Sequence, residues 1–481
     1  MDSSGSMSTL VVLLLSLTMV LAEEIRQPRA APHTGGGHPT KNYGDALHKS
    51  ILFFDAQRSG KLPANNPISW RHDSALHDCV VGGWYDAGDN VKFGFPMAAS
   101  TTLLLWGLNQ FHDGYQQAHQ TNQMYDMVKW PLDYFLAAWN PHNKHLVVQV
   151  GDGNADHSFW GRPEDMTMNR PCYSIQPGKP GSDVAGETAA ALAAGSIAFH
   201  GKDAAYSTKL LNAAESLYAF AKSNRGIYSQ SVHEAAQFYS SSGDKDEMCV
   251  AAMWLYKATH QSKYLNDAKG FHENAWAWAL SWDDKKIACQ ILLYGQTHDN
   301  QYKTEIEGFF NGWLPGGQIT YTPCGLAWRD KWGSNRYAAN AAFAALVAAE
   351  EGVMTAKLRP WAIEQINYML GDNSHMGSTC YSYEIGFGSH FPQQPHHRGA
   401  SCTANCPGDA LHSPHPNPHQ LTGALVGGPD QHDHYQDKRE DYVMNEVACD
   451  YNAGFQSALA GIEHLIKTNN FPPTHNKCAC H

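Results

Sequence analysis

The feature of this sequence that most constrains its fold is a helical hairpin that recurs along the chain. Apolar residues repeat at helical spacing in segments that follow one another in pairs. Residues 187–200 and 206–223 form one pair, divided by Gly201 and a short turn. The same plan returns at residues 248–259 and from Tyr264 onward, and again at residues 336–351 and 358–370. Such a hairpin cannot bury its apolar face alone, so the hairpins must stack as an open solenoid or a closed ring.

The chain has room for a ring. Residues 41–467 divided among six hairpins leave roughly seventy residues for each, enough for two helices and a long loop. No Pro/Ser/Gly-rich linker interrupts this body, so we predict one large domain over residues 41–470. Long loops rich in Gly, Pro and His interrupt the helices at residues 78–96, 150–180, 371–419 and 427–445. We expect these loops to line one mouth of the ring.

Both ends of the chain differ from the body. An apolar run from Leu10 to Leu21 closes on small residues before Glu23, which predicts a signal peptide over residues 1–22 and a secreted, extracellular protein. A membrane anchor is the alternative, but the run is too short to span a bilayer. Residues 23–40 are predicted to form a loose leader, and residues 471–481 form a Cys/His tail.

The chain contains 11 cysteines, which in an exported protein indicates one or more disulfides. The odd count leaves at least one thiol free or intermolecular, and the pairing cannot be derived. Cys402 and Cys406 are loop cysteines close in sequence. Cys478 and Cys480 stand near His481, where they could bind a metal or belong to an irregular C-terminus.

Charge excludes some partners. The net charge is −12 and Lys and Arg do not cluster, so neither nucleic acid nor an anionic membrane would be attracted. The partner is expected to be neutral. The chain has 14 Trp and 22 Tyr, which suit a cleft that stacks sugar rings, although they also suit a core.

Two carboxylates stand three residues apart in a Gly-containing turn with aromatic neighbours, at Asp86 and Asp89 within Gly83-Trp84-Tyr85-Asp86-Ala87-Gly88-Asp89-Asn90. One could hold a water molecule while the other deprotonates it. An ordinary Asp-rich turn or a cation-binding loop would give the same pattern.

A third carboxylate, Glu446, stands among apolar and aromatic neighbours in Tyr442-Val443-Met444-Asn445-Glu446-Val447-Ala448. Such surroundings raise a carboxyl pKa, so Glu446 could stay protonated and donate to a leaving oxygen. A glutamate at a helix N-terminus would look the same. Pro395-His396-His397-Arg398 offers donors for sugar hydroxyls, although twin histidines are also zinc ligands.

These segments, in this order, resemble glycoside hydrolase family 9, the endo-β-1,4-glucanases, over nearly the whole mature chain. The resemblance implies an all-α fold, an (α/α)6 barrel of six helical hairpins, that hydrolyses internal β-1,4-glucosidic bonds of cellulose and related glucans by inversion. Asp89 would be the catalytic base, Asp86 would position the attacking water and Glu446 would be the acid. His396 and Asp437 would also be catalytic. The substrate-binding positions implied are Tyr85, His157, Trp160, Trp278, Trp332, Arg336, Arg398 and Tyr451.

The resemblance also implies a structural Ca²⁺. Residues 242–247 and 282–285 are similar to the family's calcium site, with hydroxyl, carbonyl and carboxylate oxygens that suit this ion. The ligands carried over are Ser242, Gly243, Asp246, Glu247 and Asp283. Asp246 and Glu247 could instead be acidic residues in the first turn of a helix.

The chain departs from the family pattern at His390, where the family usually has Asn, Lys or Arg, and this affects only the local loop. We expect a monomeric, bare catalytic domain acting on soluble or amorphous glucan. Two other functions remain open: a related (α/α)6 hydrolase acting on another β-glycan such as chitosan or xyloglucan, and a non-catalytic carbohydrate-binding protein.

Overall fold

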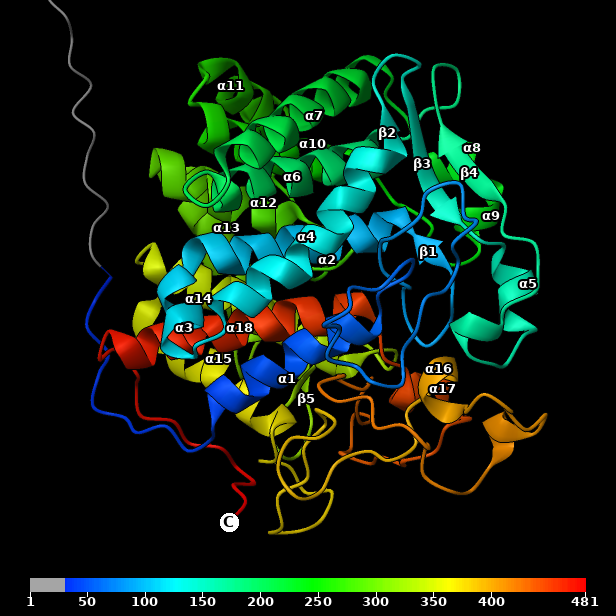
Figure 1. Cartoon of the computed structure of the whole chain (residues 1–481). Helices are drawn as coiled ribbons and strands as arrows, with labels where there is room; N and C mark the ends of the chain where they lie inside the picture. Colours follow the sequence, from blue (N-terminus) through cyan, green and yellow to red (C-terminus); the bar gives the residue numbers. More distant parts are fainter. Residues whose placement is uncertain (1–30) are drawn as a thin grey trace, which may run out of the picture.

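The computed structural model describes residues 31–481, and the predicted signal peptide lies outside them. Helices make up about half of this part of the chain and dominate its regular structure (Figure 1). None of these helices is long and apolar enough to span a membrane. The longer helices are α1 (Tyr43–Ala56), α2 (Gly94–Gln110), α4 (Thr121–Ala138), α6 (Ser182–Phe199), α7 (Ala204–Ser223), α10 (Lys245–Thr259), α11 (Ser262–Phe271), α12 (Lys286–Thr297), α13 (Asn300–Trp313), α14 (Ser334–Glu350), α15 (Thr355–Met369) and α18 (Cys449–Lys467). Shorter helices are α3 (His112–Gln117), α5 (Gly153–His157), α8 (Tyr228–Ser231), α9 (His233–Ala236), α16 (Arg398–Ser401) and α17 (Tyr442–Asn445).

The predicted helical pairs are confirmed as packed hairpins. α6 packs on α7, α10 on α11 and α14 on α15, and a further pair, α12 and α13, was not predicted. α6 begins at Ser182, earlier than the apolar pattern indicated. Its first turn is stabilised by Asp183, whose carboxylate accepts a hydrogen bond from the amide of Tyr228 at 3.0 Å.

The helices differ in how they are buried, and the difference follows from their sequences. α6 and α14 are Ala-rich and buried on almost every side, as expected for helices in the centre of a large core. α7 and α13 bury only one stripe. Side by side in space lie α2 and α6, α6 and α10, α10 and α12, α12 and α14, α14 and α18, and α18 and α2. Small residues permit this close packing: a Cβ added at Gly454 of α18 would lie 2.0 Å from Oδ1 of Asn340 on α14.

The fold is largely helical, as predicted, and it also contains two small antiparallel sheets that the sequence analysis did not predict. β1 (Lys92–Phe93), β2 (Trp139–Asn140) and β4 (Cys172–Ile175) each pair antiparallel with β3 (His145–Val150). β5 (Thr320–Tyr321) and β6 (Ala327–Trp328) form a second, two-stranded sheet. The larger sheet lies with α5, α16 and α17 on the right-hand side of Figure 1.

Five disulfides join Cys79 to Cys172, Cys249 to Cys289, Cys324 to Cys478, Cys380 to Cys480 and Cys402 to Cys406. Cys449 is a free, buried thiol. The predictions of disulfides and of an unpaired thiol are therefore confirmed. Cys478 and Cys480 are bonded to the body, so their sulfurs are not available for the metal binding that the sequence left open.

One buried carboxyl outside any ion pair makes the stability of the fold sensitive to pH. Glu384 is fully buried, neither of its carboxyl oxygens has a hydrogen-bond partner, and burial raises the pKa of this carboxyl well above its usual range. The folded state therefore holds this proton more tightly than the unfolded state does. The associated stability is present below the unfolded pKa and is lost as the pH rises through the folded pKa.

We predict that Glu384→Met reduces this loss, because methionine has similar length and no ionisable group. Relative to the wild-type protein, the variant should gain Tm at pH 8 and gain less, or nothing, at pH 4.5. Thermal unfolding followed by circular dichroism across this range checks the prediction. An equal Tm difference at every pH would contradict it.

Candidate active site

The loop that carries Asp86 and Asp89 follows α1 and precedes β1, and backbone contacts hold it from several sides. The amide of Cys449, at the start of α18, donates to the carbonyl of Asp86 at 2.8 Å. The amide of Arg398 donates to the carbonyl of Gly88 at 2.9 Å. A Cβ at Gly88 would lie 1.9 Å from the carbonyl oxygen of His396, so only glycine allows this close approach.

A buried chain of hydrogen bonds through Gln57 and His397, called the Gln57 relay below, also holds this loop. Nε2 of Gln57, which directly follows α1, donates to the carbonyls of Tyr85 at 3.1 Å and Ala87 at 2.7 Å. Its Oε1 lies 2.9 Å from Nε2 of His397. Nδ1 of His397 accepts from the amide of Ala400, so the proton of this ring resides on Nε2 and is donated to Gln57. Burial lowers the pKa of His397 to about 3, which keeps the ring neutral.

Asp86 and Asp89 are both buried and differ in their partners. Asp86 accepts a hydrogen bond from the hydroxyl of Tyr239. Burial, then the nearby Asp89 and Asp450, raise the pKa of Asp86 well above its usual range. Asp89 lies 4.0 Å from Nε2 of His157 and accepts the amide of Ala87 at 3.2 Å. When Asp86 is protonated it carries no negative charge, so it does not repel the negative charge of an ionised Asp89.

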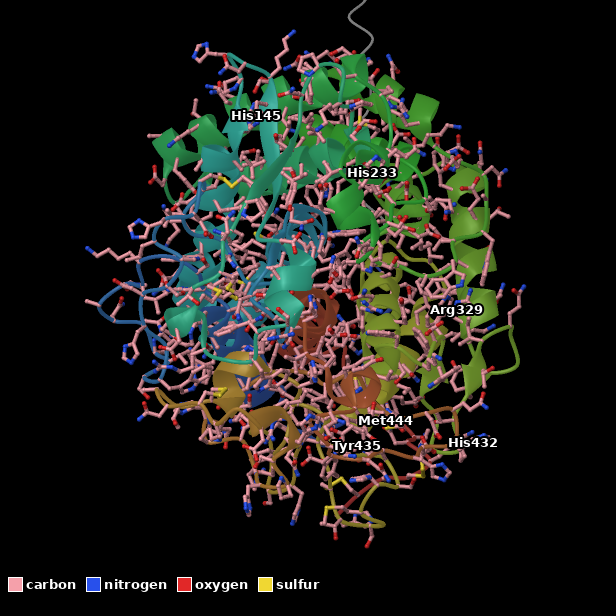
Figure 2. All side chains as sticks on the ribbon, turned by 90° about the vertical axis from the view of Figure 1, so that its right-hand side faces the viewer. His145, His233, Arg329, His432, Tyr435 and Met444 are labelled. Atoms are coloured by element: carbon pink, nitrogen blue, oxygen red, sulfur yellow. A yellow bond between two sulfur atoms is a disulfide. The ribbon has the colours of Figure 1, made fainter. Side chains whose placement is uncertain are left out.

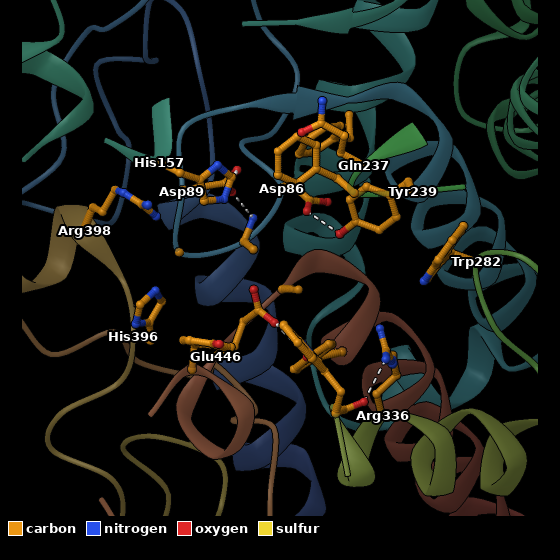
Figure 3. A pocket seen from close by; sticks show the side chains of 18 of the residues that line it. Asp86, Asp89, His157, Gln237, Tyr239, Trp282, Arg336, His396, Arg398 and Glu446 are labelled. Carbon is orange, nitrogen blue, oxygen red and sulfur yellow. Dashed lines mark hydrogen bonds and ion pairs between the residues drawn. The ribbon is translucent and has the colours of Figure 1, made fainter. Parts of the chain in front are cut away.

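Glu446 lies across the site from these aspartates (Figure 3). It follows α17 and precedes α18 in extended backbone, so it is not the helix N-terminal residue that the sequence left open. Its Oε2 accepts from the indole of Trp332 at 2.7 Å and from the hydroxyl of Tyr451 at 3.0 Å. Burial raises the pKa of Glu446 above its usual value, and these two hydrogen bonds oppose that rise. The carboxyl is suited to holding a proton for transfer.

A buried ion pair organises the residues around Glu446. Nη1 of Arg336 on α14 lies 2.7 Å from Oδ2 of Asp450 on α18. Nη2 of Arg336 donates to the carbonyl of Trp332 at 2.9 Å, and the guanidinium carbon lies 4.7 Å from the centre of the Tyr451 ring. Arg336 thus contacts both residues that donate to Glu446.

His396 offers a neutral ring. Its Nδ1 lies 2.7 Å from the carbonyl of Arg439, which can only accept, so Nδ1 carries the proton. Burial lowers the pKa of His396 to about 4. Its Nε2 is therefore available to accept a hydrogen bond from a hydroxyl group. The ring packs edge-on against Trp160 at 5.0 Å, and Trp160 in turn lies 5.0 Å from the guanidinium of Arg398.

These residues surround a cavity of about 630 Å³, seen from close by in Figure 3. Nine of the predicted site residues line it: Asp86, Asp89, His157, Trp332, Arg336, His396, Arg398, Glu446 and Tyr451. The predicted long loops contribute many of them, as the sequence indicated.

Four predicted site residues lie outside the cavity lining. Tyr85 is buried beneath the loop, with its hydroxyl 2.8 Å from Oγ of Ser74. Asp437 accepts the amides of Gln393 and Gln394 at 2.6 and 2.9 Å. Trp160 donates to Oγ of Ser401 at 3.0 Å behind His396, and Trp278 packs edge-on against Tyr337 at 5.0 Å. Neither Tyr85 nor Asp437 lines the cavity: the Tyr85 hydroxyl contacts the Ser74 side chain, and the Asp437 carboxylate accepts two backbone amides.

The cavity also contains residues that the sequence analysis missed: Phe93, Gln237, Phe238, Tyr239, Trp282, Tyr337 and Tyr442. Tyr239 stands in an irregular stretch after α9 with no distinctive pattern, so no sequence signal indicated it. Trp282 directly precedes the predicted ligand Asp283, and this position was the available clue.

A compact group of metal-ligating side chains lies at the aspartate side of the cavity. Asp89, Asp156 and His157 each offer a ligand atom, and these atoms lie within 4.8 Å of one another. Within residues 31–481 this is the one such group of His, Cys, Asp and Glu.

The predicted calcium ligands lie at the start of α10 and in the loop before α12. The backbone amide of Lys285 donates to Asp246 at 2.6 Å, and the Lys285 ammonium lies 3.0 Å from Oε1 of Glu247. Oε2 of Glu247 is buried with no hydrogen-bond partner, and Asp283 accepts the amide of Ser242 at 2.8 Å. Burial and Asp246 raise the pKa of Glu247 well above its usual range. Oxygen donors of this kind suit a calcium ion by their chemistry, but the three carboxylates do not form a compact group like the one above, and Glu247 is already paired with the Lys285 ammonium.

The chain is similar to proteins of known function over most of its length. It is 45% identical to Endoglucanase A of Bacillus pumilus over 459 residues, which is 90% of this chain and 68% of that protein. Its structure matches an endoglucanase of the termite Nasutitermes takasagoensis with a TM-score of 0.85 and 48% identity, covering 89% of this chain and 100% of the other.

A further match is the endoglucanase CelQ of Clostridium thermocellum, whose structure was solved with cellotriose. The TM-score is 0.81 and the identity 39%, over 90% of this chain and 72% of that one. The family model for glycosyl hydrolase family 9 matches residues 43–459, which include both walls of the cavity. With that match and these relatives, the chain belongs to glycosyl hydrolase family 9.

Proposed function

We propose that this protein is an endo-β-1,4-glucanase that hydrolyses β-1,4-glucan with inversion at the anomeric carbon. The observation that carries the proposal is the arrangement of the cavity, in which Asp86 and Asp89 lie on one side and Glu446 lies opposite, within a wall of aromatic rings. Direct displacement by water needs an acid and a base on opposite faces of the sugar ring. The endoglucanase relatives support the choice of β-1,4-glucan as substrate.

In this mechanism Glu446 donates its proton to the glycosidic oxygen as the bond to the anomeric carbon breaks. A water molecule between Asp86 and Asp89 attacks the opposite face of that carbon. Asp89 takes the proton of the water, and Asp86 holds the water in line. His396 and Arg398 offer an acceptor and donors for sugar hydroxyls, and Trp332 and Tyr451 orient the acid.

The scaffold proposed for this site is an (α/α)6 barrel of six helical hairpins in a single catalytic domain over residues 41–470. The chain of neighbours α2, α6, α10, α12, α14 and α18, with α18 returning to α2, supports a closed inner ring. We also propose secretion after cleavage of residues 1–22. The five disulfides support an oxidising compartment.

Two alternatives use the same residues differently. A related hydrolase acting on another β-glycan would keep the acid and the base and change the sugar contacts. A non-catalytic binding protein would not need Glu446 and Asp89 on opposite walls. Release of reducing ends from a panel of carboxymethylcellulose, xyloglucan and chitosan separates the three.

Glu446→Gln should lower kcat on carboxymethylcellulose by about 10³-fold, because glutamine cannot donate the proton to the leaving oxygen. The Tm should change little, since the amide can still bond Trp332 or Tyr451. Reducing-sugar release and thermal unfolding check both parts. Activity within tenfold of the wild-type level would contradict the role of Glu446.

The stereochemistry gives a second, independent test. If Asp89 activates water directly, the first product from cellohexaose is the α-anomer, which NMR detects before mutarotation. Because the acid must be protonated, kcat/KM should fall as the pH rises through the raised pKa of Glu446. An initial β-anomer would exclude inversion.

We further propose that Ser242, Gly243, Asp246, Glu247 and Asp283 hold Ca²⁺, which would brace α10 against the loop before α12 and take no part in bond cleavage. Chelation with EDTA should lower the Tm by several degrees, and added Ca²⁺ should restore it. The variant Glu247→Gln should lose most of this response, because it removes the unpaired carboxylate oxygen. An identical Tm with EDTA and with Ca²⁺ in the wild-type protein would contradict calcium binding.

A further inference from the structure

Exposed large hydrophobic side chains are unevenly placed on this protein. In the described part of the chain they are Leu76, Val81, Trp276, Trp278, Trp332, Met376 and Tyr442. The aromatic members gather around one region. Trp332 and Tyr442 line the cavity, and Trp278 packs against Tyr337, which also lines it.

Trp276 extends this region away from the cavity. The guanidinium carbon of Arg329 lies 4.2 Å from the centre of the Trp278 ring and 5.7 Å from that of Trp276, so it contacts both indoles. Nε of Arg329 also donates to the carbonyl of Trp278 at 2.8 Å. In Figure 2, Arg329 lies above and to the right of Tyr435 and Met444. The contacts therefore run without a break from the cavity through Tyr337 and Trp278 to Arg329 and Trp276.

The indole of Trp276 is held in place although 41% of the residue is exposed. It lies over α13, where its ring centre is 6.4 Å from that of Phe309. A Cβ added at Gly312 would lie 3.2 Å from Cζ2 of Trp276, so glycine leaves the space that the ring occupies. A ring fixed between a helix and a guanidinium loses little freedom when a ligand stacks on it.

We propose that Trp276 and Arg329 form a glucan-binding position outside the catalytic cavity, which holds a chain that extends beyond the bond being cut. The proposal rests on the proposed function. The apolar C–H face of a glucose ring stacks on an indole, and the guanidinium has N–H groups left to donate to its hydroxyls. The surface area of two indoles and one guanidinium is much smaller than the roughly 800 Å² that a stable protein partner covers. The position suits a polysaccharide that the cavity already binds.

Substrate length provides the test. Binding is measured by isothermal titration calorimetry in the Glu446→Gln protein, with cellohexaose as the long ligand and cellobiose as the short one. Adding Trp276→Ala should weaken cellohexaose binding about three- to tenfold, because one ring contact is lost. The loss for cellobiose should be below twofold, since the cavity alone can hold it. Trp276→Phe should restore part of the cellohexaose affinity.

Met376→Ala is the matched control, because it removes an exposed hydrophobic side chain that does not line the cavity. It should leave both affinities unchanged. Equal weakening for both ligands in Trp276→Ala, or no weakening for cellohexaose, would overturn the proposal. If the Glu446→Gln protein bound neither oligosaccharide, and the wild-type protein cut no glucan, the proposed function would fail with it. Thermal unfolding confirms that each variant is folded.

Discussion

The buried ion pair between Arg336 and Asp450 is the contact on which the candidate active site depends. Several carboxyl groups share one poorly solvated space, and Arg336 is a cation placed beside Asp450 and near Glu446. A buried charge is stable only when it is paired and its remaining polar groups are satisfied. Arg336 is paired with Asp450, and its Nη2 also donates to the carbonyl of Trp332 and the hydroxyl of Tyr337, while its Nε and Oδ1 of Asp450 have no partner. The same bonds join α14 to α18 and set the orientation of the residues that contact Glu446.

Much of the helical plan could be predicted from sequence, because buried helices produce a periodic apolar pattern. α6 with α7, α10 with α11 and α14 with α15 were all identified in this way. The strands were missed since several are only two residues long, and so short an element has no readable period. The start of α6 was also misjudged. Asp183 in its first turn accepts the amide of Tyr228, and no local pattern reveals a partner so far along the chain.

The candidate site was predictable where its residues belong to long, distinctive segments, as Asp86, Asp89 and Glu446 do. It was not predictable for Gln57, which donates to two carbonyls of the aspartate loop, or for Tyr239, which donates to Asp86, because both stand in ordinary sequence surroundings. Two further predicted residues make contacts that the sequence did not reveal. Tyr85 and Asp437 lie beside functional residues in sequence, yet their polar atoms bond to Ser74 and to backbone amides. A sequence motif combines residues that act on a ligand with residues that hold the loop.

The Gln57 relay has a consequence for the order of events during synthesis of the protein. Gln57 follows the first helix, whereas His397 and Glu446 lie in the last quarter of the chain, and α1 packs on α18. A nascent chain that has emerged only as far as α15 contains both aspartates but neither the relay histidine nor the acid. The site therefore assembles only when the two ends of the chain meet. A fragment that ends before His397 lacks Glu446 and the histidine contact that supports Gln57.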